Sequence, residues 1–454
     1  MRPMIKYYFT TFGDIYAGFE FQEMNFPDFK IIVQADKLKD YTALSDSEKT
    51  LEKIKEFANV CPLSAFVEEV EASKISKRPR LENDNGWKSD YDRKNMFVFG
   101  AGASAYCVNE NRQAEFEKDE LRPPLGNGLF SRKFKKFYDK YDGVKLSLYD
   151  LQHDKANVEE YLEEEWKEVQ ESGNQAVMSR HINIQFYLQE LLMEISKRVS
   201  KEYYDSNLYA KLADKLQKIN ARNRKMHFAF VSFNQDTILE SFLSKYFKRP
   251  LSDLDEYVEV NDSPFCVFKP HGSWNWGWQF PNKVGNRQKN LFDDDVNFHE
   301  LYYKYLGKPI DMVGWGDWGL ELMLNVHRKG KLTIDKSRIA LFDESDLGNF
   351  YPAILLPYRD KDEFTMSPKH ICQLNHYFSY VEKLFVIGWK GNEALFNNIL
   401  KNNANKIRRV IIVDPDHKTV EENLREILNK PGVTKIIYND FEDFIKNGLD
   451  KELK

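Results

Sequence analysis

The residues of this 454-residue chain that are best suited to chemistry follow five short apolar runs. In chain order they are Gly100-Ala101-Gly102-Ala103-Ser104, Asn234-Gln235-Asp236, His271, Gly388 and Asp414. Glycine permits close approach of the backbone to a ligand, amide and carboxylate groups bind hydroxyls or water, and histidine exchanges protons near neutral pH. Because such runs are typical of buried strands, and open α/β sheets bind ligands at the carboxyl ends of their strands, the pattern predicts one shared site.

The first segment has the composition of a turn that contacts a nucleotide phosphate. Gly100 and Gly102 directly follow the apolar run 96–99, so the backbone can turn sharply and approach a pyrophosphate. The helix expected after the turn would present its first N–H groups to the anion. The G-x-G-x-x-G fingerprint is incomplete, because Ala105 occupies the position of the third glycine. A tight strand-to-helix turn without a ligand is the structural alternative.

The next two segments carry the candidates for acid–base chemistry. Asn234 and Asp236 follow one apolar run and can reach a bound ribose or a water molecule. His271 follows another run and can orient a hydroxyl or act as a general base. Taken singly, the first two residues are also compatible with a cap on the helix expected near Thr237, and the histidine with a structural role. Three tryptophans that follow could wall a pocket or belong to the core: Trp274, Trp276 and Trp278.

Gly388 and Asp414 suit the adenosine half of a dinucleotide. They follow the apolar runs 384–387 and 410–413. A glycine allows close approach of the ligand, and a carboxylate at a strand end can bind a ribose hydroxyl. Each is also compatible with an ordinary exit from a strand into a loop.

Continuous apolar runs along the chain predict the strands that position these residues. The runs cover residues 96–99, 228–233, 265–268, 353–356, 384–387, 410–413 and 435–438. Several are apolar throughout rather than alternating, which is typical of parallel strands that are buried on both faces. Helical patterns, such as 418–428, lie between some of them, so we predict a doubly wound α/β fold with a parallel sheet.

Three regions lie outside this strand pattern. Residues 150–225 carry apolar stripes at helical spacing and predict a large helical insertion. A second insertion is expected at about 280–350, a segment rich in Trp, Gly, Asp and Tyr. Residues 1–75 mix β-rich runs with a helical pattern at 47–60, and we expect residues 1–90 to form a small N-terminal region of unknown role.

Composition argues against several classes of protein. Hydrophobic residues make up 42% of the chain and charged residues 30%, as in a globular protein. A net charge of −5 gives no indication of direct nucleic-acid binding. The sequence has no apolar run long enough for a membrane span and no secretory signal at its start. Its four cysteines are far apart without a CxxC pair, which predicts buried free thiols in a reducing cytoplasm rather than a zinc module.

In their order, the five segments resemble the sirtuin-like NAD-binding family, and within it the bacterial branch found in anti-phage defence proteins. The segment Arg122-Pro123-Pro124-Leu125-Gly126-Asn127-Gly128-Leu129-Phe130 strengthens the resemblance, because that branch often carries a similar proline–glycine stretch after its GAGAS turn. The resemblance covers about residues 94–445. It implies a Rossmann-like sheet in a domain spanning 94–450, with NAD as the ligand.

The resemblance also implies a role for each matching residue. Asn234 and His271 match the catalytic asparagine and histidine of the family. The other matches would contact NAD: Gly100, Ala101, Gly102 and Ser104 at the pyrophosphate and ribose, Asp236 on the nicotinamide side, and Gly388 and Asp414 on the adenosine side.

Departures from the family pattern shape the expected reaction. Trp389 and Lys390 stand where Ser or Thr usually follow the later glycine, and Ser232 and Phe233 precede the asparagine in place of Thr-Gln or Thr-Thr. The four-cysteine zinc module of the deacetylating sirtuins is missing, and we expect no metal site. The resemblance therefore favours an NAD hydrolase, which converts NAD to nicotinamide and ADP-ribose and depletes the NAD pool in abortive infection.

Two other functions stay open. One is a non-catalytic module that binds NAD or ADP-ribose and a partner, although such a module need not keep both Asn234 and His271. The less favoured one is a protein deacylase. Since an enzyme that empties the NAD pool harms its own cell, we expect an inactive resting form, a homo-oligomer in the cytoplasm, and release by a partner ATPase or nuclease or by a phage-derived trigger.

Overall fold

The structure is a computed structural model of the chain. It describes residues 92–141, 158–259, 263–279, 339–342, 350–356, 365–403 and 406–453, except 173–174, with isolated residues between 142 and 157. In the N-terminal region it describes the backbone of four strands.

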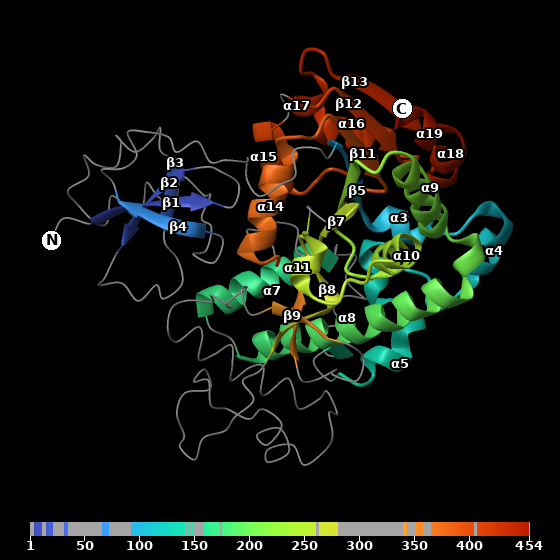
Figure 1. Cartoon of the computed structure of the whole chain (residues 1–454). Helices are drawn as coiled ribbons and strands as arrows, with labels where there is room; N and C mark the ends of the chain where they lie inside the picture. Colours follow the sequence, from blue (N-terminus) through green and yellow to red (C-terminus); the bar gives the residue numbers. More distant parts are fainter. Residues whose placement is uncertain are drawn as a thin grey trace.

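A six-stranded parallel sheet forms the centre of the described structure (Figure 1). Its strands are β5 (Asp92–Phe99), β6 (Met226–Ser232), β7 (Phe265–Phe268), β11 (Lys383–Ile387), β12 (Arg409–Val413) and β13 (Thr434–Tyr438). They lie in the order β13-β12-β11-β5-β6-β7, and every neighbouring pair is parallel. The first strand of this sheet in chain order, β5, therefore lies at its centre. The chain continues outward through β6 and β7, and then returns to form the other half from β11 to β13. The predicted α/β fold with a parallel sheet is confirmed at this level.

The central strands are apolar on both faces because both faces are covered. All seven residues of β6 are buried. In β5, Phe97 stacks on Phe385 of β11 at 4.3 Å and on Phe230 of β6 at 5.4 Å, measured between ring centroids. Full burial of one such side chain contributes about 1.5–3 kcal/mol, so the three rings join both halves of the sheet strongly. The edge strand β13 is only partly buried.

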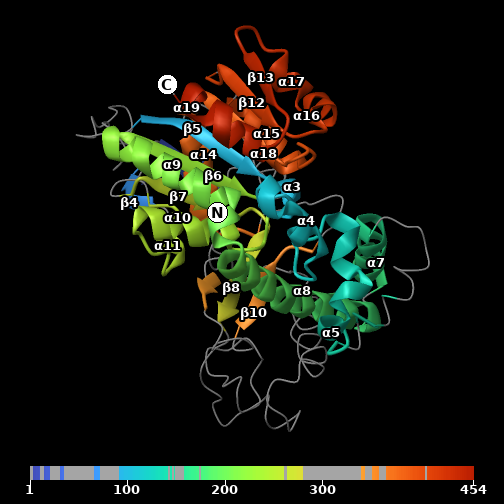
Figure 2. The same ribbon diagram turned by 90° about the vertical axis from the view of Figure 1, so that its right-hand side faces the viewer.

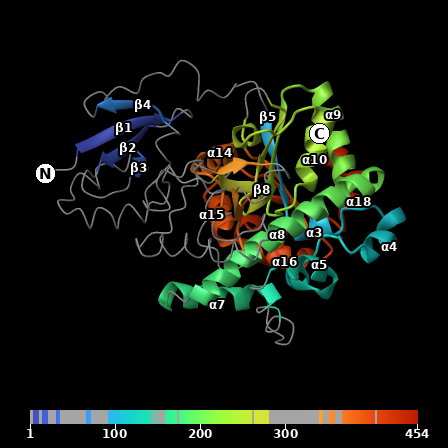
Figure 3. The same cartoon turned by 90° about the horizontal axis from the view of Figure 1, so that it is seen from below.

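Helices lie on both sides of this sheet. Figures 1 and 3 show α9 (Leu208–Arg222) and α10 (Ile238–Phe247) on one side, and α14 (Pro368–Phe378) and α15 (Ala394–Asn403) on the other. The chain ends in short helices, from α18 (Phe441–Asp443) to α19 (Leu449–Glu452), and this segment contacts α9. The side chains that leave the strand ends are thus held by packed helices.

Most of the chain between β5 and β6 is helical. It includes α3 (Ala101–Ala105), α4 (Glu110–Lys118), α5 (Lys135–Tyr138), α7 (Val158–Ser172) and the long α8 (Gln175–Glu202). Figure 2 shows α8 running beneath the sheet, where it packs against β8 and β10. The apolar stripe that predicted this helix is buried, as in Ile184, Leu188, Leu191 and Ile195.

One predicted strand belongs to a different sheet. The apolar run at 353–356 overlaps β10 (Phe350–Ile354), which pairs antiparallel with β8 (Gly272–Gln279) rather than joining the parallel sheet. On its other side β8 pairs with β9 (Ile339–Leu341). An apolar run indicates burial but not the partner strand, and the partner here lies more than seventy residues away in sequence. The predicted helix at 418–428 is also divided, at Leu424, into α16 (His417–Asn423) and α17 (Arg425–Leu428).

The N-terminal region holds a separate antiparallel sheet. Its strands are β1 (Met4–Thr10), β2 (Ile15–Glu20), β3 (Ile31–Gln34) and β4 (Phe66–Glu71), in the order β3-β2-β1-β4. The helix predicted at 47–60 and most of the insertion predicted at 280–350 lie outside the described residues. Among the helices that are described, none is long and apolar enough to cross a membrane.

Candidate functional site

All nine site residues predicted from the sequence line one cavity of about 1130 Å³. They are Gly100, Ala101, Gly102, Ser104, Asn234, Asp236, His271, Gly388 and Asp414. The cavity lies along the carboxyl ends of the parallel strands, from the segment after β7 to the segment after β13. Its volume exceeds the roughly 300–1,000 Å³ of sites for drug-sized ligands, so it has room for a dinucleotide.

The two glycine turns at the centre of the sheet pack directly on each other. The Gly102 N–H donates to the Gly388 carbonyl at 3.1 Å, and the Gly100 N–H donates to the Ile387 carbonyl at 3.1 Å. Gly388 has a φ of +58°, and a Cβ there would come within 2.2 Å of the Ala103 nitrogen. Only glycine fits this contact. Gly388 therefore has a structural role that its spacing in the sequence did not reveal.

Because of this packing, fewer backbone N–H groups are free to bind a phosphate than the sequence predicted. The N–H groups of Gly100 and Gly102 already donate to carbonyls of the neighbouring loop, and the Ala103 N–H donates to the Gly100 carbonyl at 3.0 Å. They do not point freely into the cavity as the expectation required. The helix that was expected to present its first N–H groups to the anion is α3, and it has only five residues.

The Asn234 side chain is fixed by its amide nitrogen. Nδ2 donates to the Gly100 carbonyl and to Ser104 Oγ, both at 2.9 Å. Ser104 Oγ in turn lies 3.1 Å from the hydroxyl of Tyr209, a buried residue of α9. Asn234 Oδ1 accepts no bond from the described residues and is not buried, so this oxygen faces the cavity. The acceptor that the site presents is thus Asn234 Oδ1. Its position is set by the contacts of Nδ2 with the Gly100 carbonyl and Ser104, and by that of Ser104 with Tyr209.

Asp236 is held by a contact to the start of α10. Its Oδ1 accepts a hydrogen bond from the Ile238 N–H at 3.1 Å, and the N-cap residue of the helix is Thr237, whose side chain makes no capping bond. Its side chain also lines the cavity. Burial raises the pKa of the Asp236 carboxyl, while the positive charge of Lys269 and a hydrogen bond from Ser104 oppose that change.

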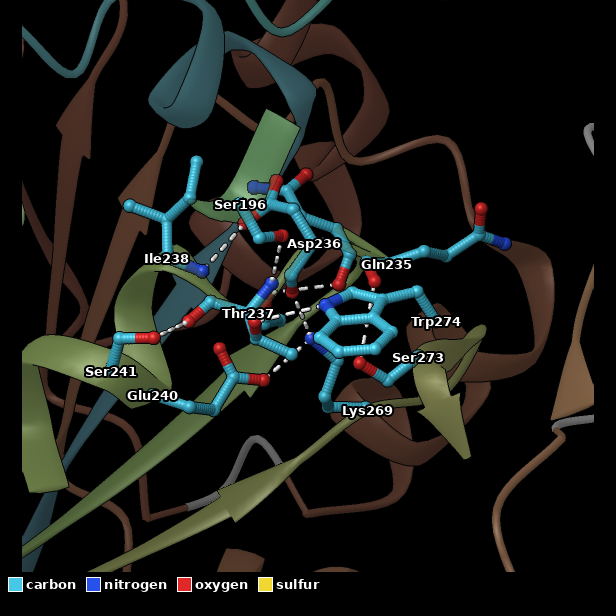
Figure 4. Close-up of polar contacts among 12 residues, drawn as sticks. Ser196, Gln235, Asp236, Thr237, Ile238, Glu240, Ser241, Lys269, Ser273 and Trp274 are labelled. Carbon is cyan, nitrogen blue, oxygen red and sulfur yellow. Dashed lines mark hydrogen bonds and ion pairs between the residues drawn. The ribbon is translucent and has the colours of Figure 1, made fainter. Parts of the chain in front are cut away.

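A buried ion pair supports the turn that carries these residues (Figure 4). Lys269 is fully buried, and its Nζ contacts the Glu240 carboxylate and donates to the backbone carbonyl of Asp236. Burial raises the pKa of Glu240, and the nearby ammonium group lowers it. The Trp274 indole also donates to Thr237 Oγ1 at 3.0 Å. The turn after β6 is therefore held against the segment that carries His271.

His271 is placed by a constrained backbone and an aromatic cluster. Gly272 follows it with a φ of +74°, and a Cβ there would lie 1.8 Å from the Ala353 carbonyl oxygen. The imidazole lies 5.0 Å from the ring of Phe233, which stacks on Trp389 at 5.1 Å. Its Nε2 lies 3.3 Å from Oε2 of Glu393. The histidine thus faces the cavity between an apolar wall and a carboxylate.

Asp414 lies on the other side of the cavity, at the end of β12. Its Oδ1 accepts a hydrogen bond from the Asp416 N–H at 2.8 Å. Burial raises the pKa of the Asp414 carboxyl, and the charge of Lys390 opposes that rise. The Asp414 carboxyl thus lines the cavity beyond the second glycine turn.

The proline–glycine segment after α4 contributes to the rim of the cavity. Its members that line the cavity are Pro123, Pro124, Leu125, Gly126 and Leu129. Leu125 is 44% exposed and Tyr106 47% exposed, so the rim has apolar groups in contact with solvent. Such groups can contact a planar base or a nicotinamide ring.

Two of the three tryptophans left open by the sequence belong to the core. Trp274 and Trp276 are buried and neither lines the cavity, while the side chain of Trp278 lies outside the described part of the structure. Trp276 packs against Tyr257 at 5.4 Å and against His370 at 5.5 Å. Trp389, which the sequence marked as a departure from the family pattern, lines the site and is the one tryptophan to do so among the described residues.

Several residues of the site had no role predicted from the sequence. Tyr209 is one of them, because a tyrosine on the buried face of an amphipathic helix has no distinguishing signal. Glu393 and Lys269 stand close to predicted residues in sequence, but their contacts join different strands. Comparison with known protein families and with curated proteins gave no match for this sequence.

Proposed function

We propose that the protein is an NAD hydrolase that binds NAD across the carboxyl edge of its parallel sheet. The observation that carries this proposal is the convergence of an amide, a histidine, two glycine turns and a carboxylate on one cavity. The resemblance to the sirtuin-like family supplies the ligand. The geometry supports it by bringing together residues up to 314 positions apart, from Gly100 to Asp414.

The strand order supports a Rossmann-like, dinucleotide-binding fold. Numbered along the chain, the six strands read 3-2-1-4-5-6, and the order reverses between β5 and β11. Ligands of open α/β sheets bind in the crevice at such a reversal point. Gly100 follows β5 and Gly388 follows β11, so the two turns flank this crevice. NAD would then place its pyrophosphate near the turns, its nicotinamide end toward Asn234 and its adenosine end toward Asp414.

The reaction breaks the bond between nicotinamide and ribose through an oxocarbenium-like transition state. Water supplies a hydroxyl group to the anomeric carbon, the bonding electrons leave with neutral nicotinamide, and one proton is released with ADP-ribose. Asn234 Oδ1 would accept a hydrogen bond from the attacking water or from a ribose hydroxyl. His271 would take the proton from that hydroxyl or water.

Positioning and exclusion of water would supply most of the rate. Nicotinamide leaves as a neutral molecule and needs little acid catalysis. Phe233, Trp389 and Phe396 form an apolar wall beside His271, with the first two rings 5.1 Å apart. Because this wall excludes water and lowers the local dielectric constant, it would strengthen the polar contacts to the ribose.

The test is release of nicotinamide from NAD by the pure protein. Wild type should release it, while Asn234→Ala and His271→Ala should lose most activity and keep the fold. Asn223→Ala is a control, because Asn223 ends α9 on the surface. The assay should span a range of protein concentrations, so that activation by self-assembly is seen. Equal release by wild type and both site variants would refute the assignment.

A binding experiment separates the hydrolase from a non-catalytic module. If NAD binds in the cavity but no concentration of protein releases nicotinamide, the module is favoured. A protein deacylase would instead consume NAD only with an acyl-lysine peptide. On the resemblance alone, we also propose that the enzyme is a cytoplasmic homo-oligomer that acts in abortive infection, and that a partner or phage product releases it from an inactive state.

A further inference from the structure

The carboxylate of Glu393 and the imidazole of His271 form a pair inside the cavity. Their Oε2 and Nε2 atoms are 3.3 Å apart, and both residues line the cavity. The two side chains are 13% and 10% exposed, so water screens the pair little. Contacts of this kind in a site without substrate are often longer than in the reacting complex.

The loop that carries Glu393 is held in place on both sides. It begins at Gly388, and Glu393 directly precedes α15, where its carbonyl accepts a hydrogen bond from the Asn397 N–H at 2.9 Å. Asn397 Nδ2 also donates to the Gly391 carbonyl at 2.6 Å. The backbone from which the Glu393 carboxylate extends is therefore fixed, and its side chain is only 13% exposed.

The same loop packs on the first glycine turn through the contact between Gly388 and Gly102. One short segment thus joins the adenosine side of the cavity to the side that carries His271. A change in this loop can affect the histidine without a direct contact to the substrate.

Other charged groups on the segments around His271 have different partners. Lys269 pairs with Glu240 and contacts the backbone of Asp236. The Asp236 carboxylate accepts hydrogen bonds from the Ile238 N–H and from Ser104. Lys390 is exposed on the glycine loop and acts on Asp414. Glu393 is the carboxylate that the geometry joins to the imidazole.

We propose that Glu393 is the positioning residue of His271, holding the imidazole ring and stabilising the imidazolium formed when the histidine accepts a proton. This inference rests on the proposed NAD hydrolysis. The proton moves from a ribose hydroxyl or water to the imidazole, Glu393 stays ionised throughout, and the proton leaves to solvent after ADP-ribose forms. Acid partners of this kind orient the base in other His-containing sites.

The kinetic test compares Glu393→Gln, which removes the charge but keeps the shape, with Glu393→Asp, which keeps the charge. A negative charge this close stabilises the protonated imidazole, so its removal favours the neutral ring. We expect the acidic limb of the kcat/KM profile to move to lower pH by about one unit. We also expect kcat to fall about tenfold or more, with partial recovery in Glu393→Asp. Glu426→Gln, at an exposed ion pair with Lys401, is the matched control and should leave both unchanged.

A second measurement does not depend on catalysis. NMR titration of protein labelled in its histidine rings, with His271→Ala to assign the signal, reports the protonation of His271 directly. A lower midpoint in Glu393→Gln than in wild type supports the pair, and an unchanged midpoint overturns it. If wild type releases no nicotinamide, the proposed function fails while this titration still decides the role of Glu393. If Glu393→Gln does not fold, the titration of Glu393→Asp decides instead, because a shorter carboxylate moves the midpoint only if the charge acts on the ring.

Discussion

At the scale of single residues, the direction in which the Asn234 amide points decides what the site can bind. Its Nδ2 donates to the Gly100 carbonyl and to Ser104 Oγ, which leaves Oδ1 for the ligand. Aspartate at this position has the same shape but no hydrogen to donate. A carboxylate oxygen would then face the Gly100 carbonyl oxygen in a buried place, where an unsatisfied group costs about 1–3 kcal/mol.

We therefore expect Asn234→Asp to lower the free energy of unfolding by about 1–3 kcal/mol and to abolish nicotinamide release. Chemical denaturation and the release assay are the measurements. Asn223→Asp is the matched control, since the Asn223 side chain accepts a bond from the Lys225 N–H at 3.3 Å and an aspartate can accept it too. A similar loss of stability in both variants would show that the donor role of Asn234 is not the cause.

Asp414 provides a second prediction at this scale, in which stability and binding change in opposite directions. Burial raises the pKa of its carboxyl in the folded state. For an acid whose pKa is raised on folding, the protonated form favours the native state, so stability is highest at low pH and falls as the pH rises through the folded-state pKa. Asn can still accept the Asp416 N–H bond but carries no charge.

We expect Asp414→Asn to raise the free energy of unfolding near neutral pH by less than about 1 kcal/mol, because the charge of Lys390 offsets part of the cost of burying the carboxylate. The fall in wild-type stability above the unfolded-state pKa of about 4 should become shallower in the variant. If the carboxylate binds a ribose hydroxyl, calorimetry should also show weaker NAD binding. A variant less stable than wild type at pH 7 would contradict the assigned cause of the shift.

At the scale of elements, the contact between the two glycine turns holds the halves of the sheet in register at the site. Any other residue at position 388 meets two separate obstacles: the left-handed φ, and the 2.2 Å that would separate its Cβ from the Ala103 nitrogen. Gly432 has a φ of +84° and an open surrounding, with its nearest atom at 3.9 Å. An alanine at position 432 would therefore meet the left-handed φ but no close contact of its Cβ.

We expect Gly432→Ala to cost about 1–2 kcal/mol of unfolding free energy, the penalty of the left-handed conformation alone. Gly388→Ala should cost clearly more, because the backbone of the turn must also move. It should weaken NAD binding as well, since the Gly102 and Gly388 turns separate. Thermal unfolding and calorimetry measure both effects, and equal losses in the two variants would show that the close packing of the turns has no energetic weight.

The sequence predicted the parallel strands well because each is a continuous apolar run with both faces buried, as in β6. It could not assign β10, because the partner of a strand is a non-local property and its partner β8 was not in the predicted set. The site residues after the strands were predicted because parallel strands bring their carboxyl ends to one edge. The pairs Glu393–His271 and Lys269–Glu240 were not, since each forms only when different strands come together.

At the scale of the whole molecule, the cavity lies where the two halves of the parallel sheet meet. The half from β5 to β7 carries Asn234 and His271, and the half from β11 to β13 carries Gly388 and Asp414. A dinucleotide that spans the cavity must contact both halves, whereas its fragments contact one. A ligand that binds the native state alone stabilises it by RT ln(1 + [L]/Kd), so occupancy can be detected without catalysis.

We expect hydrogen exchange to resolve the two halves. AMP, the adenosine half of NAD, should slow exchange in the loops after β11 and β12, at residues 388–393 and 414–416, while nicotinamide alone should not. NAD bound to the inactive variant His271→Ala should slow exchange in those loops and also at residues 234–237 after β6, because only the whole dinucleotide reaches both sides. The loop at 429–432, which lies outside the cavity, serves as an internal control. Protection by NAD confined to one half would mean that the two strand-end clusters do not form a single dinucleotide site, and the assignment of both ends of the ligand would fall together.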